Sequence, residues 1–222
     1  MPIQSIIQSS FLNPLPRDPG KLPLMLTVSG EYGAGGRELA RYLASKWQVT
    51  FFDPDIIDRI VAESIRNKDL SDQLDRSLPE MLDDWFHALW KKKKDDTSKS
   101  VYYLHLVKTV MSIAKTGGVI VGRGAHLILA GQTAVFRLKV EGSRDFCARN
   151  ISQKEGISLK AAKDLAARMD AERVDFVREI YRRFPTHNTY YDLVLGAESL
   201  SREQMGTIVE LAMREAGFHI PE

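Results

Sequence analysis

Short apolar runs alternate along the chain with longer segments in which apolar residues recur at helical spacing. The apolar runs cover residues 24–28, 49–52, 119–121, 133–140 and 191–195. The segments of helical spacing between and after them cover residues 36–47, 55–65, 101–115, 143–153, 158–184 and 201–216. Buried strands that alternate with amphipathic helices are typical of a parallel sheet with helices on its faces. The pattern therefore predicts an α/β fold built on a parallel sheet of about five strands flanked by helices.

The first apolar run leads into a glycine-rich stretch, SGEYGAGGRELA, and helical spacing begins immediately after the glycines. Glycine permits backbone conformations that other residues resist. A loop of this kind directs backbone N–H groups inward and ends at the positive end of a helix, which makes it a binding site for phosphate. We expect the phosphates of a cofactor to be bound by Gly30, Gly33, Ala34, Gly35, Gly36 and Arg37.

This loop matches the phosphate-loop pattern only in part. Gly30 and Gly35 have the required spacing, but Gly36 stands where the pattern has lysine and Arg37 stands where it has serine or threonine. The backbone cradle can survive these changes, whereas the lysine that reaches the outer phosphates and the hydroxyl that binds magnesium are missing. The planar guanidinium of Arg37 can supply positive charge in their place.

Two other interpretations of the loop stay open. Gly33 and Gly35 could begin a dinucleotide-binding fingerprint, and Asp53 follows at about the 20-residue distance expected for a ribose-binding acid. Glu38 argues against this fingerprint because it stands where a third small residue must pack. A tight turn without a ligand is the other alternative, although four glycines are a costly way to build a turn.

Composition is that of an ordinary globular protein. The chain has 222 residues, 44% hydrophobic and 27% charged, and its net charge of +2 argues against a broadly basic nucleic-acid surface. Because Cys147 is the only cysteine, an intrachain disulfide and a multi-cysteine zinc site are excluded, and a reducing cytoplasm is the expected location. No apolar run reaches the roughly 20 residues of a membrane helix. We expect no nucleic acid, membrane or structural metal among its partners.

Two segments stand outside the alternating pattern. Residues 1–22 contain four prolines and few paired apolar positions, which predicts a loose extension or an arm that packs on a partner. A homodimer is therefore one possible assembly. Residues 66–100 are strongly charged but keep apolar residues at helical spacing. They predict a helical insertion within a single domain spanning 23–222.

Arginines gather at two places. Arg123 directly follows the apolar run 119–121, so it should lie at the carboxyl edge of the sheet, near the glycine loop. The region 160–187 contains five arginines, a composition suited to a mobile lid that closes over phosphates and stabilises the charge of phosphoryl transfer. Charge pairs between neighbouring turns of a surface helix are the alternative.

In combination, these motifs resemble the cytidylate kinase-like proteins, which are relatives of bacterial cytidylate kinase among the nucleoside monophosphate kinases. The resemblance rests on the glycine-rich run, the strand VIVGRGAHLIL, the arginine-rich segment around Asp170 and Arg173, and the ending YDLVLGAESLS. It covers residues 24–216, with a poor match over 66–100. The resemblance implies a P-loop kinase-like fold.

The resemblance also implies roles on the acceptor side of the site. In cytidylate kinases an Asp after the second strand is followed six residues later by an Arg that contacts the nucleoside monophosphate, and Asp53 and Arg59 stand in this relation. Gly122 and Arg123 match the centre of the family's Asp-Gly-Arg-Asp motif, whose two acids are replaced here. We therefore expect Asp53, Arg59 and Arg123 to bind the phosphate acceptor.

The lid and the glycine loop differ in how well they match. Asp170 and Arg173 are similar to the lid pair of the family, whereas Gly36 and Arg37 depart from true cytidylate kinases, which keep lysine and a small residue there. The resemblance therefore does not identify the acceptor.

We predict a nucleotide-dependent phosphotransferase that uses ATP with Mg²⁺ and passes the terminal phosphate to a small-molecule acceptor. The predicted catalytic residues are Arg37, Arg123, Arg173 and Arg178. No side chain needs to act as a covalent nucleophile, because positioning and electrostatics dominate such reactions. A nucleotide-binding regulator that has lost catalysis is the first alternative, favoured by the missing lysine. A dinucleotide-binding oxidoreductase is the second.

Overall fold

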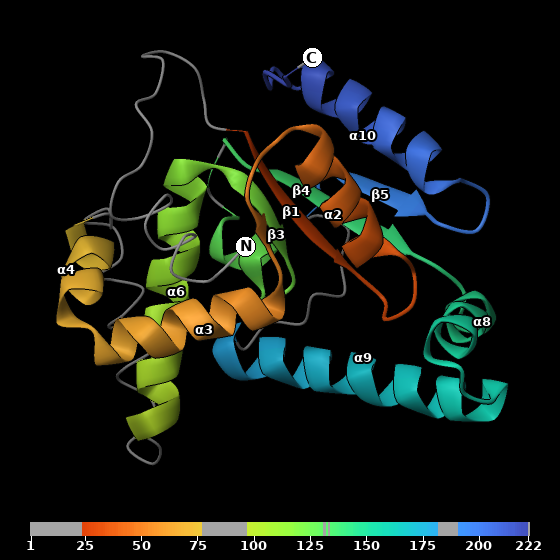
Figure 1. The fold of residues 1–222 in the computed structure, drawn as a ribbon, viewed down its shortest axis with the longest axis horizontal. Helices are drawn as coiled ribbons and strands as arrows, with labels where there is room; N and C mark the ends of the chain where they lie inside the picture. Colours follow the sequence, from red (N-terminus) through yellow and green to blue (C-terminus); the bar gives the residue numbers. More distant parts are fainter. Residues whose placement is uncertain (1–23, 77–96, 131, 133, 182–190, 222) are drawn as a thin grey trace.

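The structure is a computed structural model that describes residues 24–76, 97–130, 132, 134–181 and 191–221. Within these residues, five strands form one sheet in the order β2-β3-β1-β4-β5, and every neighbouring pair is parallel (Figure 1). The strands are β1 (Met25–Gly30), β2 (Phe51–Phe52), β3 (Gly118–Val121), β4 (Phe136–Glu141) and β5 (Leu193–Gly196). The predicted α/β fold class is thereby confirmed.

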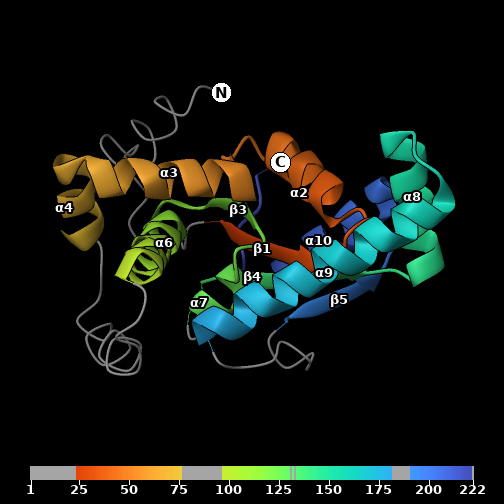
Figure 2. The ribbon, with the colours of Figure 1, turned by 90° about the horizontal axis from the view of Figure 1, so that it is seen from below.

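Eight helices flank the sheet in the described part of the chain. They are α2 (Gly36–Lys46), α3 (Pro54–Arg66), α4 (Lys68–Arg76), α6 (Thr97–Thr116), α7 (Ala125–Ile128), α8 (Arg144–Glu155), α9 (Leu159–Tyr181) and α10 (Arg202–Glu215). In Figure 2 the helices α3, α4 and α6 form one group, and α9 runs past the sheet toward α8. No helix among the described residues is long and apolar enough to cross a bilayer.

Alternate side chains of the central strand β1 pack into two separate hydrophobic cores, one on each face of the sheet. Leu26 and Val28 pack with α2 and α10, whereas Met25 points to the opposite face and packs with α3 and α6. Successive side chains of a strand point to opposite faces, so a strand covered on both sides is mainly apolar, and Thr27 is the buried polar exception in β1. This explains why the chain begins its fold with a continuous apolar run.

The structure differs from the predicted elements in several places. The second strand is shorter than predicted, and the short helix α7 was not predicted. Residues 122–124 all have positive φ angles, which ends β3 and lets a new helix begin at Ala125. The predicted arm 1–22, residues 77–96 of the predicted insertion and residues 182–187 of the predicted lid lie outside the described residues.

Substitution of Gly30 should test how tightly the central strand is packed. Gly30 has a φ of 153°, and a Cβ there would lie 2.0 Å from the carbonyl oxygen of Val140. We expect Gly30→Ala to lower the free energy of unfolding by about 3 kcal/mol, because of backbone strain and overpacking. Gly196→Ala is the matched control, since a Cβ at Gly196 meets nothing within 4 Å. Urea unfolding measures both variants, and equal stability of the two would contradict the packing described.

Candidate active site

The glycine loop connects the end of β1 to the start of α2. The N–H of Ala34 donates to the carbonyl of Glu31 at 3.1 Å, which closes the turn. Gly35 is the N-cap residue of α2, and among the described residues no side chain caps it. The first N–H groups of a helix have no acceptor within the helix, and the helix dipole makes this end positive. The N–H groups of Gly36 and Arg37 therefore lack acceptors within the helix and lie at its positive end, an arrangement typical of anion-binding helix termini.

Gly36 occupies the position at which phosphate loops carry lysine, but the backbone does not require glycine there. A Cβ on Gly36 would lie 3.5 Å from side-chain atoms of Val28 and Val140, which is ordinary van der Waals contact. The path of the backbone would therefore accommodate a lysine at this position.

Helices α8 and α9 hold the loop from the outside. Asn150 on α8 donates to the carbonyl of Gly33 at 2.9 Å. On α9, Asp170 Oδ1 accepts from the N–H of Tyr32 at 2.9 Å, and the Arg173 guanidinium donates to the carbonyl of Gly30. The structure thus brings the arginine-rich segment to the glycine loop, as the sequence predicted for Arg173.

Arg37 lies against the predicted acceptor residue Asp53. Its Nη2 atom is 2.6 Å from Asp53 Oδ2 and 3.4 Å from Asp55 Oδ2. Asp53 is only 6% exposed and caps α3 by accepting from the N–H of Ile56 at 3.0 Å. Burial alone would raise the pKa of the Asp53 carboxyl, but the Ile56 N–H and the Arg37 guanidinium outweigh it and hold this pKa below its usual value. Arg37 therefore links α2 to α3.

Arg123 forms a second ion pair, with a residue that the sequence analysis missed. Its Nε donates to Asp58 Oδ1 at 2.8 Å and its Nη2 donates to Asp58 Oδ2. The hydroxyl of Tyr102 donates to the same carboxylate at 2.7 Å. The ring of Phe176 on α9 lies beneath the Arg123 guanidinium, 5.2 Å from ring centroid to Cζ. One helix, α9, therefore contacts both the glycine loop and the Arg123 cluster.

Arg59 and Arg178, two further predicted site residues, are both exposed. Arg59 is exposed on α3, and no hydrogen bond or ion pair within the described part of the chain holds it. Arg178 is exposed and pairs with Asp175 on the same helix at 3.2 Å. Asp58 was missed because its partner lies 65 residues away in the sequence, and no local pattern records such a contact.

A buried histidine supports the loop from beneath. His126 on α7 is 4% exposed, its Nδ1 is 3.0 Å from the hydroxyl of Ser29, and its Nε2 is 3.1 Å from the hydroxyl of Tyr191. The Tyr191 ring stacks on the imidazole at 4.9 Å. Since Ser29 precedes Gly30 in β1, this network connects the start of the loop to the residues that enter β5.

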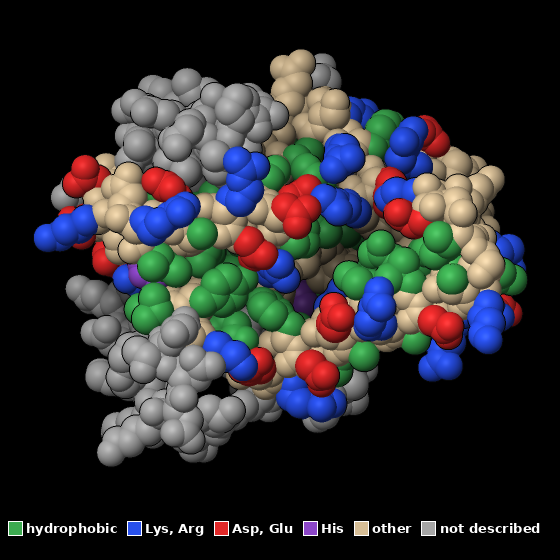
Figure 3. Space-filling view, turned by 60° about the horizontal axis from the view of Figure 1, so that its bottom comes forward, with side chains coloured by type: hydrophobic (Ala, Val, Ile, Leu, Met, Phe, Trp, Pro, Cys, Tyr) green, Lys and Arg blue, Asp and Glu red, His purple; other side chains and the backbone are tan. Residues whose placement is uncertain are grey.

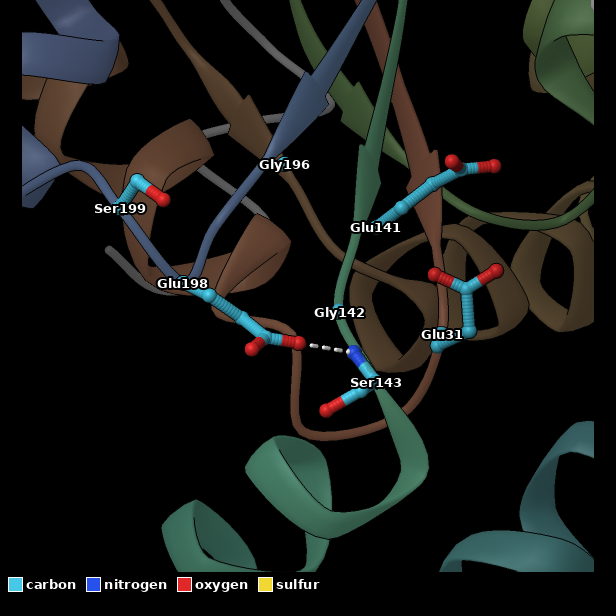
Figure 4. A pocket seen from close by; sticks show the side chains of 7 residues that line it. All are labelled: Glu31, Glu141, Gly142, Ser143, Gly196, Glu198 and Ser199. Carbon is cyan, nitrogen blue, oxygen red and sulfur yellow. Dashed lines mark hydrogen bonds between the residues drawn. The ribbon is translucent and has the colours of Figure 1, made fainter.

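A pocket of about 570 Å³ adjoins the loop at the carboxyl ends of β4 and β5 (Figure 4). It is lined by Glu31, Glu141, Gly142, Ser143, Gly196, Glu198 and Ser199. Glu198 Oε1 accepts from the N–H of Ser143 at 2.6 Å. Burial raises the pKa of the Glu31 carboxyl, and Lys139 lies 3.8 Å from it. Glu31 belongs to the glycine loop, so the pocket continues the site along the sheet edge.

The parallel strand order and the glycine loop after the central strand define a P-loop kinase-like α/β protein. The model of the Cytidylate kinase-like family matches residues 25–199, and the chain belongs to this family. The crystal structure of an uncharacterized protein from Eubacterium ventriosum aligns with a TM-score of 0.65 and 15% identity, covering 86% of this chain and 98% of that one. This likeness shows a shared fold.

Two further comparisons are weaker. A shikimate kinase from Bacteroides thetaiotaomicron aligns with a TM-score of 0.45 and 14% identity, over 88% of this chain and 99% of that one, and decides nothing about this chain. The uronate isomerase of Corynebacterium glutamicum is 25% identical over 114 residues, which are 51% of this chain. The chain spans only 22% of the length of that curated relative, so the match transfers no activity.

The buried histidine makes a testable contribution to the pH dependence of stability. Burial, together with the charges of Lys139 and Arg137, lowers the pKa of His126 from 6.5 to about 4. The unfolded chain therefore binds this proton at higher pH. The neutral imidazole of His126 therefore contributes fully to the free energy of unfolding above pH 6.5. This contribution is lost as the pH falls from 6.5 to 4, by roughly 1.4 kcal/mol per pH unit. We expect His126→Gln to show a correspondingly shallower pH dependence in urea unfolding. Parallel curves for the two proteins would contradict this assignment.

Proposed function

We propose that this protein is a nucleotide-dependent phosphotransferase that passes the terminal phosphate of ATP, or of a similar nucleotide, to a small-molecule acceptor. The observation that carries the proposal is the glycine loop, which ends in the N–H groups that begin α2 and whose first residue, Gly30, accepts a hydrogen bond from Arg173. Membership of the Cytidylate kinase-like family supports the same activity. A cytoplasmic location and a homodimer stay predictions from the sequence.

On the donor side, the proposal assigns the phosphates to the backbone N–H groups of the loop, chiefly those from Gly35 to Arg37. Arg173 would neutralise charge that develops on the transferred group, since its guanidinium already lies at the first residue of the loop. Arg178 lies about one and a half turns further along α9, and its catalytic role stays a prediction. On the acceptor side, the proposal assigns the phosphate acceptor to Asp53, Arg59 and Arg123.

Mg²⁺ fits this site only as an ion bound mainly by the nucleotide. Arg37 replaces the hydroxyl that phosphate loops offer to the metal, and the described residues contain no cluster of three His, Cys, Asp or Glu side chains suited to a metal. Magnesium is commonly held by one or two carboxylates together with substrate phosphates. Bound in this way, it would supply charge neutralisation between the donor phosphates.

A nucleotide-binding regulator is the second candidate. The loop lacks its lysine, the Tyr32 N–H is occupied by Asp170, and Arg37 is paired with Asp53. A protein that only senses nucleotide could keep such an arrangement. Binding without turnover would favour this candidate.

Calorimetry with ATP and Mg²⁺, a non-hydrolysable ATP analogue and NAD separates these possibilities. We expect both ATP and its analogue to bind and NAD not to bind, because the loop presents N–H groups for phosphate while Arg37 occupies the Asp53 carboxylate that a ribose would need. ATP turnover with a panel of acceptors then distinguishes an enzyme from a regulator. Binding of NAD in preference to ATP would overturn the proposal.

Replacement of Arg173 should remove activity while leaving the fold intact. We expect Arg173→Ala to lower turnover by roughly 100-fold or more, because one positioned cation at a developing phosphate charge is worth at least this much. The side chain is 42% exposed, so stability should change by less than about 1 kcal/mol. Arg168→Ala removes the same charge from an exposed position on the same helix and serves as the control. Equal turnover of the two variants would remove Arg173 from the site.

A further inference from the structure

Helix α9 contacts the backbone of the glycine loop through two side chains of opposite charge. Asp170 Oδ1 accepts from the N–H of Tyr32 at 2.9 Å, and the Arg173 guanidinium donates to the carbonyl of Gly30. Within α9, Arg173 Nη1 lies 3.4 Å from the same oxygen of Asp170. One turn of α9 therefore binds a donor and an acceptor of the loop backbone at the same time.

Asp170 places an anion on an N–H group of the loop. Carboxylate and phosphate oxygens both accept strongly from backbone N–H groups, so they compete for the same donors. Burial chiefly raises the pKa of the Glu31 carboxyl, and the nearby charges of Glu141 and Asp170 add to the rise. A further negative charge close to these carboxylates is opposed by repulsion between like charges. A phosphate that enters the loop would therefore compete with Asp170.

The loop has other contacts that fix its shape. The N–H of Ala34 closes the turn on the carbonyl of Glu31, and Asn150 donates to the carbonyl of Gly33. Neither contact brings a charge into the loop. The negative charge of Asp170 is therefore not needed to shape the backbone.

Few buried side chains hold α9 in its position. Of the α9 side chains that the structure describes, residues 159–179, only Ala162 and Val177 are buried. The helix packs mainly on α8, and Phe176 adds a partly buried contact with Arg123. Seen from the side on which α3 and α9 lie, the surface is hollowed between these two helices (Figure 3). Because segments with few buried apolar contacts open at a low cost in free energy, the polar contacts with the loop weigh heavily in placing α9.

We infer that Asp170 is an internal competitor of the nucleotide, an autoinhibitory contact that occupies the Tyr32 N–H until a phosphate displaces it. The inference rests on the proposed phosphotransferase function. Arg173 lies on the same turn of α9, so it leaves the Gly30 carbonyl together with Asp170 and becomes available to the phosphate. The apparent affinity for nucleotide is reduced according to the fraction of molecules in which the Asp170 contact is formed.

Calorimetry with a non-hydrolysable ATP analogue and Mg²⁺ tests the competition. We expect Asp170→Ala to bind the analogue about tenfold more tightly than the wild type, because a hydrogen bond to a charged group is worth about this factor. Asp170→Asn loses the charge but keeps an oxygen acceptor for the Tyr32 N–H, so its affinity should lie between the two. Asp164→Ala removes the same charge from an exposed position on α9 and should leave the affinity unchanged. Urea unfolding of each variant verifies the fold.

A distance measurement without nucleotide tests the position of α9 separately. Spin labels are attached through Ala167→Cys on α9 and Leu211→Cys on α10, which are exposed positions, whereas the native Cys147 is buried. Helix α10 is a fixed reference because its buried face packs into the core. We expect the ATP analogue to shift the distance distribution of the labelled protein. Asp170→Ala should produce the shifted population without nucleotide, because the contact that holds α9 on the loop is lost.

Each outcome has a defined meaning. Equal or weaker binding of the analogue by Asp170→Ala overturns the inference and assigns Asp170 to shaping the loop, while the proposed function stands. A distance distribution of nucleotide-free Asp170→Ala identical to that of the wild type also overturns the inference. An equal gain in affinity in Asp164→Ala assigns the effect to net charge and overturns the role of Asp170. Failure of the wild type and of every variant to bind the analogue overturns the proposed function and the inference with it.

Discussion

The close approach of Gly30 to the backbone of Val140 determines where the site can form. β1 is the central strand, paired on both sides, and its last residue leaves no space for a side chain next to β4. The chain therefore leaves the sheet at its carboxyl edge through a glycine turn and enters α2 directly. Backbone N–H groups at the start of α2 follow from this path, because helix geometry leaves them without internal acceptors. The exposed N–H groups of the loop are thus a consequence of sheet packing.

One helix connects the two halves of the candidate site. Along α9, Asp170 and Arg173 contact the glycine loop, and Phe176 supports Arg123. Phe176 is three positions after Arg173, so both side chains lie on neighbouring parts of one helix face. A displacement of α9 would change the glycine loop and the surroundings of Arg123 together. Most arginines near the site already form ion pairs with acidic side chains. The ligand selectivity of such a site depends on which ion pairs a ligand can hydrogen-bond to intact and which it must separate in order to bind.

Much of the fold could be predicted from local pattern, because a strand buried on both faces needs a continuous apolar run and a helix needs periodic apolar residues. Arg173, expected near the loop from its place in an arginine-rich segment, donates to the Gly30 carbonyl, whereas Arg123, expected there from its position after a strand, pairs with Asp58 on α3. The helix α7 was missed because the left-handed backbone at residues 122–124 interrupts an otherwise apolar sequence. The pairing of Asp58 with Arg123 and of Asp170 with the Tyr32 N–H depends on tertiary packing between distant segments, which no local pattern encodes.

The central claim is that the N–H groups after β1 bind the phosphates of a nucleotide in place of the missing lysine. A crystal structure of the protein with a non-hydrolysable ATP analogue and Mg²⁺ tests it most directly. The account predicts phosphate oxygens within hydrogen-bond distance of the backbone nitrogens of Gly35, Gly36 and Arg37, with the Arg173 guanidinium on the outer phosphate. A nucleotide bound elsewhere, with these backbone nitrogens free of phosphate and Arg173 still on the Gly30 carbonyl, would contradict the account.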